Sequence, residues 1–153
     1  MNSIVVDQRF KSVQSILKLT FGIVPIVAGI DKFTNLLTDW TQYLSPAFLD
    51  ISPVSAEVFM MIVGVIEIIA GIIVLSRPAL GGIIVAGWLT VIALTLLTSG
   101  HYLDVAVRDL VMAISAYAMS KLTRVRNEIS EDKSTASGYL FNNNRQMKKE
   151  TVK

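Results

Sequence analysis

The sequence predicts an all-α integral membrane protein, built as a four-helix up-and-down bundle. Two observations predict this fold class. The 153 residues are 52% hydrophobic, and their mean hydropathy of +0.56 is higher than that of most soluble domains of this size. From Val58 to Leu103 the only charged residues are Glu67 and Arg77. A surface that faces water cannot be built from such a stretch, so we expect it to lie in a bilayer.

Four apolar segments supply the spans, because about 20 helical residues cross the hydrocarbon layer. We expect them at residues 13–30, 58–75, 80–97 and 103–122. The third segment carries no charge, whereas the fourth has charged residues in its first turns and inserts only with its polar half facing the bundle. Within the first segment, the run Leu19–Ile30 also has the length of a signal-peptide core, but the eighteen residues before that run are long for a signal-peptide n-region.

The segments between and around the spans have different characters. Residues 1–12 form a short N-terminal segment, 31–57 an outer interfacial loop, and 123–153 a polar tail that we expect to be disordered. Within the loop, Trp40, Tyr43 and Leu44 have helical spacing. This spacing fits a short amphipathic helix at the outer interface, and equally an ordinary loop anchored by aromatic rings.

The basic residues are distributed asymmetrically along the chain. With four spans and a cytoplasmic N-terminus, twelve of the fourteen Lys and Arg residues lie inside, and only Lys32 and Arg108 lie outside. The positive-inside rule therefore places both termini in the cytoplasm of a cell whose inner membrane holds the protein. The net charge of +2 comes from the chain ends and gives no basic patch for nucleic acid.

Glu67 is the first candidate functional residue, because an acid in mid-span is a functional pointer in membrane proteins. Gly64 and Gly71 share its helix face, so a neighbouring helix can approach the carboxyl closely. A carboxyl in this position is either a neutral hydrogen-bonding acid or half of an ion pair. We expect Arg108 to be the partner, since counted depths place both residues in the outer half of the membrane.

Other polar residues reach the same level. His101, Asp104 and Arg108 share one face of the fourth segment while Asp109 lies on another, and Asp31 and Lys32 end the first. These seven residues are the candidates for a ligand or proton site: Asp31, Lys32, Glu67, His101, Asp104, Arg108 and Asp109. A structural lock between Glu67 and Arg108 explains the same pattern and stays open beside the site hypothesis.

Several chemistries lack the residues they need. The chain has no cysteine and a single histidine, so we expect no metal site and no thiol chemistry. No phosphate-binding glycine loop, nucleophile triad or HExxH motif occurs. Catalysis by this chain alone is therefore not expected, although the outer polar cluster could hold a quinone headgroup.

Three short motifs resemble the DoxX-like family of small four-helix membrane proteins. The first segment ends in FGIVPIVAGIDKFTNLL, the second contains GVIEIIAGIIVLSRP, and the fourth contains RDLVMAISAYAMSKL. The positions that match the family pattern are Gly22, Gly29, Lys32, Glu67, Gly71, Arg108 and Asp109. The resemblance covers about residues 13–122. The glycine-rich end of the second segment is reduced here to Ala70 and Gly71.

The resemblance implies a role in a redox or detoxification system, since the family includes the membrane subunit of an archaeal thiosulfate:quinone oxidoreductase. We expect an accessory or quinone-linked membrane subunit, with quinone as the candidate cofactor and the lipid bilayer and other membrane or redox proteins as partners. A homo-oligomer is also compatible with the sequence. The alternatives are a small proton-coupled transporter with a membrane-embedded glutamate and a membrane assembly factor or chaperone.

Overall fold

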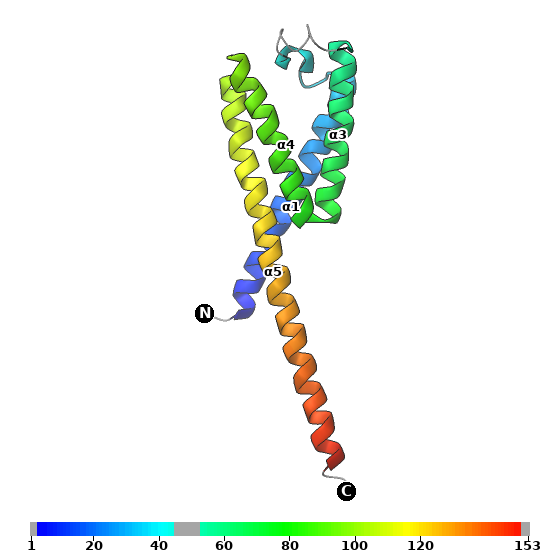
Figure 1. Cartoon of the computed structure of the whole chain (residues 1–153), viewed down its shortest axis with the longest axis vertical. Coiled ribbons are helices and arrows are strands. Elements are labelled where there is room, and N and C mark those ends of the chain that lie inside the picture. The colour runs from blue at the N-terminus through cyan, green and yellow to red at the C-terminus, as the bar shows by residue number, and fades with distance from the viewer. Residues whose placement is uncertain (1–2, 45–52, 151–153) are drawn as a thin grey trace.

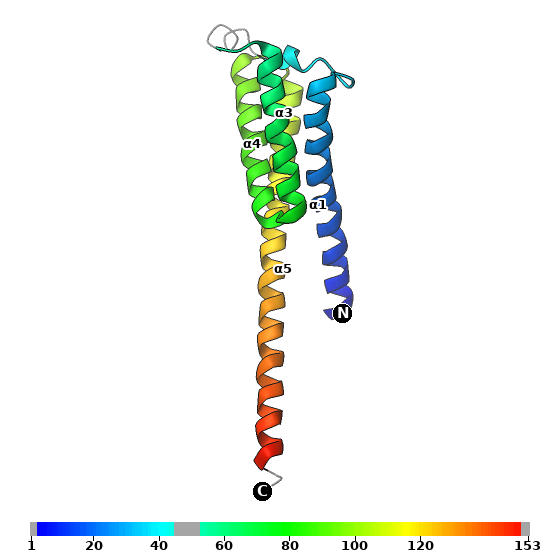
Figure 2. The same cartoon turned by 90° about the vertical axis from the view of Figure 1, so that its right-hand side faces the viewer.

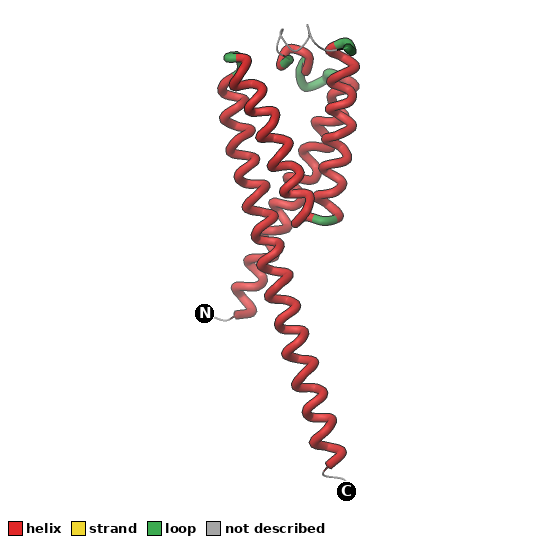
Figure 3. Tube along the Cα trace, viewed as in Figure 1, coloured by secondary structure: helices red, strands yellow, loops and turns green. Residues whose placement is uncertain are grey.

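The computed structural model describes residues 3–44 and 53–150, and side chains within 8–44, 53–136 and 138–139. The described part of the chain is helical and contains no strand, as Figure 3 shows, so the predicted all-α class is confirmed. Its elements are α1 (Ser3–Thr34), the 3₁₀ turn η1 (Trp40–Tyr43), α3 (Ala56–Ser76), α4 (Pro78–Ser99) and α5 (Leu103–Glu150). Of the two states left open for residues 40–44, helix or ordinary loop, the structure shows a single 3₁₀ turn, and residues 45–52 of the predicted outer loop lie outside the described residues.

The four long helices form two closely packed pairs, α1 with α3 and α4 with α5. Figure 1 shows that the pairs approach each other near the α3–α4 turn and diverge towards the end that carries η1. Both termini extend from the end opposite η1, and α5 continues far beyond the other helices (Figures 1 and 2). An up-and-down bundle therefore forms, with α5 as its longest member.

Three of the helices are long and apolar enough to cross a membrane. They are α1 over Gln8–Thr34, α3 and α4. The fourth predicted segment does not meet the same measure, because Asp104, Arg108 and Asp109 open α5. It nevertheless packs along α4 and turns Val107, Val111 and Ile114 outward, each more than half exposed. Such a surface is at home in lipid and not in water, so the chain is a membrane protein.

Local sequence signals explain where the middle helices begin and end. Ser55 caps α3 by accepting a hydrogen bond from the amide of Val58. Arg77 alone separates α3 from α4, and Pro78 starts the second helix because its fixed φ and missing N–H suit a first turn. Gly100 ends α4 in the left-handed conformation, with φ of 70°. The predicted hairpin of spans two and three therefore begins and ends within a few residues of the expected positions.

Four glycines allow the backbones of α1 and α3 to pack closely against each other. A Cβ added to Gly29 would lie 2.5 Å from the carbonyl oxygen of Gly64, and one added to Gly64 would lie 2.6 Å from the carbonyl oxygen of Gly29. A Cβ on Gly71 would meet the carbonyl oxygen of Gly22 at 2.5 Å in the same way. The two helix backbones thus touch at two levels, as the glycine face of Glu67 predicts.

The structure of residues 123–150 differs from the one that the sequence predicted. It was expected to be disordered, but α5 runs without a break to Glu150. The chain from 123 to 150 contains no proline and only one glycine, Gly138. Because these residues extend a helix that already exists, they avoid the unfavourable nucleation step that limits isolated peptides. Polar composition alone therefore did not predict the state of this segment.

A buried polar contact fastens α1 to α5 at the end opposite η1. The Gln14 side-chain amide donates a 3.0 Å hydrogen bond to the hydroxyl of Thr123, and Arg126 donates to the amide oxygen of Gln14. Gln14 and Thr123 are both buried. Since each polar group finds a partner, the contact fixes the register of the two helices without leaving an unsatisfied group.

Candidate functional site

The centre of the candidate site is an ion pair between Lys32 of α1 and Glu67 of α3. The Lys32 ammonium lies 2.6 Å from Glu67 Oε2, and the two side chains are only 4% and 12% exposed. The glycine contact just described makes this possible, because the Lys32 stem passes over Gly64, where an added Cβ would lie 3.2 Å from Lys32 Cβ. Of the two states open to Glu67, the geometry is that of an ion pair.

Arg108, the expected partner, is elsewhere. Its side chain is 65% exposed, and its Nε lies 3.5 Å from the carboxylate of the neighbouring Asp109. The predicted pairing with Glu67 is therefore wrong. Asp109 lies on a different face from Arg108, as expected, and its face is the one turned into the bundle. The reason is the rotation of α5: its inward face is made by Ala106, Asp109, Ala113 and Ala116, which are buried against the other helices.

Asp109 of α5 lies close enough to the ion pair for their charges to interact. Its residue is only 6% exposed. The charge of Lys32 acts on both Asp109 and Glu67, and the two carboxylates also act on each other. The Lys32 ammonium therefore contacts Glu67 and acts on Asp109 only through charge, while the only hydrogen bond to Asp109 among the described residues is the long one from Arg108.

Trp88 of α4 brings a free donor to the same place. Its indole Nε1 is the only buried side-chain nitrogen or oxygen without a hydrogen-bond partner among the described residues. The indole lies close enough to Glu67 for the two groups to interact, but not in the geometry of a hydrogen bond. A buried N–H without a partner is rare and energetically unfavourable, so it marks a position where an acceptor would be stabilised.

The outer side of the ion pair is covered by residues that follow α1. The Lys32 ammonium lies 3.7 Å from the centre of the Trp40 ring, a cation–π contact. Trp40 in turn donates from Nε1 to Asp31 at 2.7 Å, and the same carboxylate accepts from the amides of Leu36 and Leu37. Asp31 therefore holds the turn after α1 in place and does not enter the polar cluster.

The 3₁₀ turn η1 connects the two helix pairs at this end. The ring of Tyr43 packs on Tyr102, which precedes α5, with 4.8 Å between ring centres. Asp39 caps η1, and the hydroxyl and amide of Thr41 donate to its carboxylate. These two hydrogen bonds favour the ionised form and lower the pKa of Asp39 below its ordinary value.

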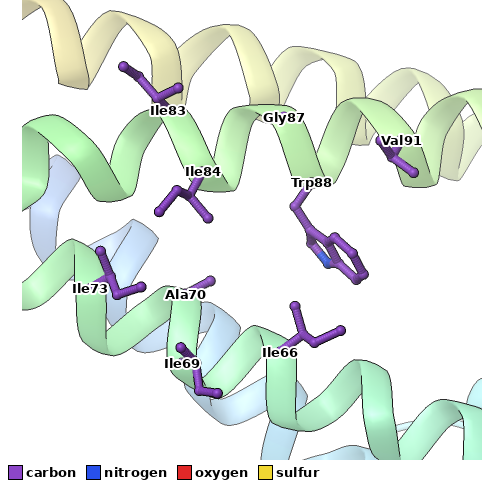
Figure 4. Close-up of a pocket in the computed structure, with 9 residues that line it drawn as sticks. All are labelled: Ile66, Ile69, Ala70, Ile73, Ile83, Ile84, Gly87, Trp88 and Val91. Carbon is purple, nitrogen blue, oxygen red and sulfur yellow. The ribbon is translucent and has the colours of Figure 1, made fainter.

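An apolar groove lies between α3 and α4 and reaches Trp88. It has a volume of about 440 Å³ and is lined by Ile66, Ile69, Ala70, Ile73, Ile83, Ile84, Gly87, Trp88 and Val91. Figure 4 shows Ile66 and Ile73 of α3 and Ile84 of α4 turned into the space between the helices, with the Trp88 ring at one end. Ile69 and Val91 are more than half exposed, so the groove opens to the surroundings.

The two remaining predicted residues lie outside this cluster. His101 is exposed in the turn before α5, where its Nδ1 lies 2.8 Å from the carbonyl oxygen of Ser99. Asp104 is also exposed. The expected convergence of His101, Asp104 and Arg108 on Glu67 is therefore wrong, and the cluster contains Lys32, Glu67, Trp88 and Asp109 instead. Among the described residues no group of three or more His, Asp or Glu side chains is placed to hold a metal ion.

Comparisons of the chain with protein families, curated proteins and solved structures give no match. The site is therefore interpreted from its own chemistry. Sequence reasoning identified three of its four residues but missed Trp88. The sequence did contain a signal for Trp88: it is an indole in the middle of an apolar span that carries no charge. The N–H of a buried indole needs a hydrogen-bond partner.

Proposed function

We propose that the protein is a DoxX-like protein of the inner membrane, with both termini in the cytoplasm, that binds the headgroup of a quinone as an accessory subunit of an oxidoreductase system. The observation that carries the proposal is the unpartnered indole N–H of Trp88, which ends an apolar groove beside the Lys32–Glu67 pair. A quinone has a carbonyl-bearing ring that could accept a hydrogen bond from this N–H, and an apolar tail that could lie in the groove.

The polar and apolar parts of the site have separate roles. Quinone carbonyl oxygens accept hydrogen bonds, and Trp88 and the Lys32 ammonium are donors that lie near each other around Glu67. The groove between α3 and α4 would hold the tail or the apolar edge of the ring, since all of its other lining residues are aliphatic or glycine. Its volume lies within the range of sites that bind small molecules, about 300 to 1,000 Å³.

Tryptophan fluorescence tests the proposal directly. The chain has two tryptophans, Trp40 and Trp88, so Trp40→Phe leaves Trp88 as the only indole. In nanodiscs, titration with a short-tail ubiquinone or menaquinone should quench Trp88 and reach saturation at low quinone-to-lipid ratio. Gly87→Phe, which fills the groove, should remove the saturable part.

A matched substitution on the lipid side controls for general effects. Val27 is half exposed on α1 and lies outside the groove, so Val27→Phe should leave the titration unchanged. Quenching that rises in proportion to quinone and is insensitive to Gly87→Phe would reflect simple partition into lipid, and the proposal would then be wrong.

A further inference from the structure

One face of α5 carries an apolar stripe that no part of the described chain covers. Its members are all exposed: Val107, Val111, Ile114, Ala118, Val125, Ile129, Ala136 and Tyr139. At 3.6 residues per turn they lie within about 40° of a single line along the helix. We call this set the exposed stripe. It lies opposite the small residues that face α4, such as Ala106, Ala113 and Ala116.

No single solvent suits the whole exposed stripe. Its first half runs beside α4, where lipid can cover valine and isoleucine. Its second half begins at Val125, beside the contact of Arg126 with α1, and continues along the part of α5 that extends beyond the other helices (Figures 1 and 2). There Tyr139 is 74% exposed. A partner that covers both halves must itself cross from the membrane into the water beside α5.

The spacing of the stripe indicates that this partner is a helix. Val107, Ala118 and Ile129 are eleven residues apart, and so are Ile114, Val125 and Ala136. An eleven-residue repeat corresponds to about 3.67 residues per turn, which is close to an ordinary α-helix and allows two nearly straight helices to stay in contact. A long helical interface also explains how a polar helix remains formed outside the bundle, where isolated helices are marginal.

We propose that the partner is α5 of a second copy, and that the protein is a parallel homodimer along the exposed stripe. Two copies inserted in the same orientation necessarily present their stripes parallel and at the same depth. Charges beside the stripe are complementary in this arrangement, because Glu128 and Lys133 lie on its opposite flanks, five residues apart. That offset joins charges between the two helices of a parallel pair, and symmetry gives the contact twice.

Two charged residues, Lys121 and Asp132, lie on the same face of α5 between members of the exposed stripe. Lys121 is turned towards the Tyr117 ring, 5.6 Å from its centre. Asp132 is exposed and has no such contact, and in a symmetric pair it faces its own copy. Like charges in that position oppose association, so the dimer is weaker than the apolar residues alone would make it.

Disulfide cross-linking of the full chain in isolated membranes tests the proposal, since the sequence has no cysteine of its own. Val125→Cys and Ile129→Cys should each give an oxidant-dependent homodimer. Asn127→Cys, at the same depth on the far side of the helix, should give little. Equal linking at all three positions would show random collision, and linking at none would show no contact; either result would overturn the proposal.

Asp132 separates a second copy from any other partner. In detergent, Asp132→Leu should shift the monomer–dimer equilibrium measured by sedimentation several-fold towards dimer, and Asp132→Lys should not, because it restores a pair of like charges. Folding is checked by helix content. An unchanged equilibrium in Asp132→Leu, or cross-linking of Ile129→Cys to a different protein, would contradict the homodimer. The test does not depend on quinone binding.

Discussion

Lys32 and Glu67 form an energetically demanding pair at the scale of single residues. Removing a charge from water costs several kcal/mol, and attraction offsets this only when the geometry is good and the remaining hydrogen-bonding positions are satisfied. Here the short contact to Glu67 and the Trp40 ring together surround the Lys32 ammonium. The pair therefore depends on both partners, and removing one of them leaves an uncompensated charge.

A double-mutant cycle checks this dependence. Lys32→Met should lower the free energy of unfolding by about 3 to 5 kcal/mol, because Glu67 is left buried without its cation. Lys32→Met combined with Glu67→Leu should recover most of that loss. The comparison is made by reversible denaturation in detergent. Arg124→Met is the matched control and should change stability by about 0.5 kcal/mol at most, since Arg124 is exposed on α5. Additive losses in the double variant would contradict the pair.

The partner of Glu67 was missed because depth along a helix can be counted directly from the sequence, whereas rotation about the helix axis has to be inferred from the kinds of residue on each face. Counting residues placed Arg108 near the level of Glu67, but α5 turns Asp109 inward. A signal for this rotation was present. Ala106, Ala113 and Ala116 share a face with Asp109, while the bulky Val107 and Val111 share another. Small residues permit close packing between helices, so they mark the inward face.

Helix contacts decide the site at the scale of elements. Gly29 and Gly64 allow α1 and α3 to touch, and this contact directs the Lys32 side chain along α3 to Glu67. The boundaries of α3 and α4 were predictable because Ser55, Pro78 and Gly100 carry strong local signals. The length of α5 was not, since no local signal ends a helix that is already formed.

Alanine substitution distinguishes glycines that are needed for the close contact of α1 with α3 from glycines that are not. Gly64→Ala places a methyl group 2.6 Å from the carbonyl oxygen of Gly29, so the helices must separate, at a cost of about 1 to 3 kcal/mol. Gly87→Ala meets nothing within 4 Å and should be neutral or stabilising by up to about 1 kcal/mol, the usual gain of alanine over glycine in a helix. Denaturation in detergent measures both. Equal effects would mean that the α1–α3 contact is looser than described.

The molecule as a whole is held together at its two ends by different means. At one end η1 joins the helix pairs through aromatic stacking of Tyr43 on Tyr102. At the other, Gln14 contacts both Thr123 and Arg126 in a buried polar junction. The extension of α5 past this junction makes no contribution to either connection, so the bundle and the extension are separable.

Two truncations test that separation. A chain ending at Arg126 retains the junction and should keep its thermal stability in detergent, although it loses three of the eight residues of the exposed stripe. A chain ending at Leu122 lacks Thr123 and Arg126, leaves the buried Gln14 amide without its partners, and should be less stable by about 1 to 3 kcal/mol. Comparable stability of the two would show that the junction contributes little.

The orientation of the whole molecule is the last prediction. Both termini leave the bundle at the end opposite η1 (Figure 1), which requires an even number of crossings and therefore that α5 spans the membrane beside α4. Twelve of the fourteen basic residues then lie on the side of the termini, which the positive-inside rule makes cytoplasmic. Because the chain lacks cysteine, Thr41→Cys and Ser134→Cys report on each side separately. A membrane-impermeant thiol reagent added to intact cells should label position 41 and spare position 134, and lysis should expose both. Labelling of both positions in intact cells would require an odd number of crossings, with α5 outside the bilayer, and labelling of position 134 alone would mean the opposite orientation; either result would contradict the prediction.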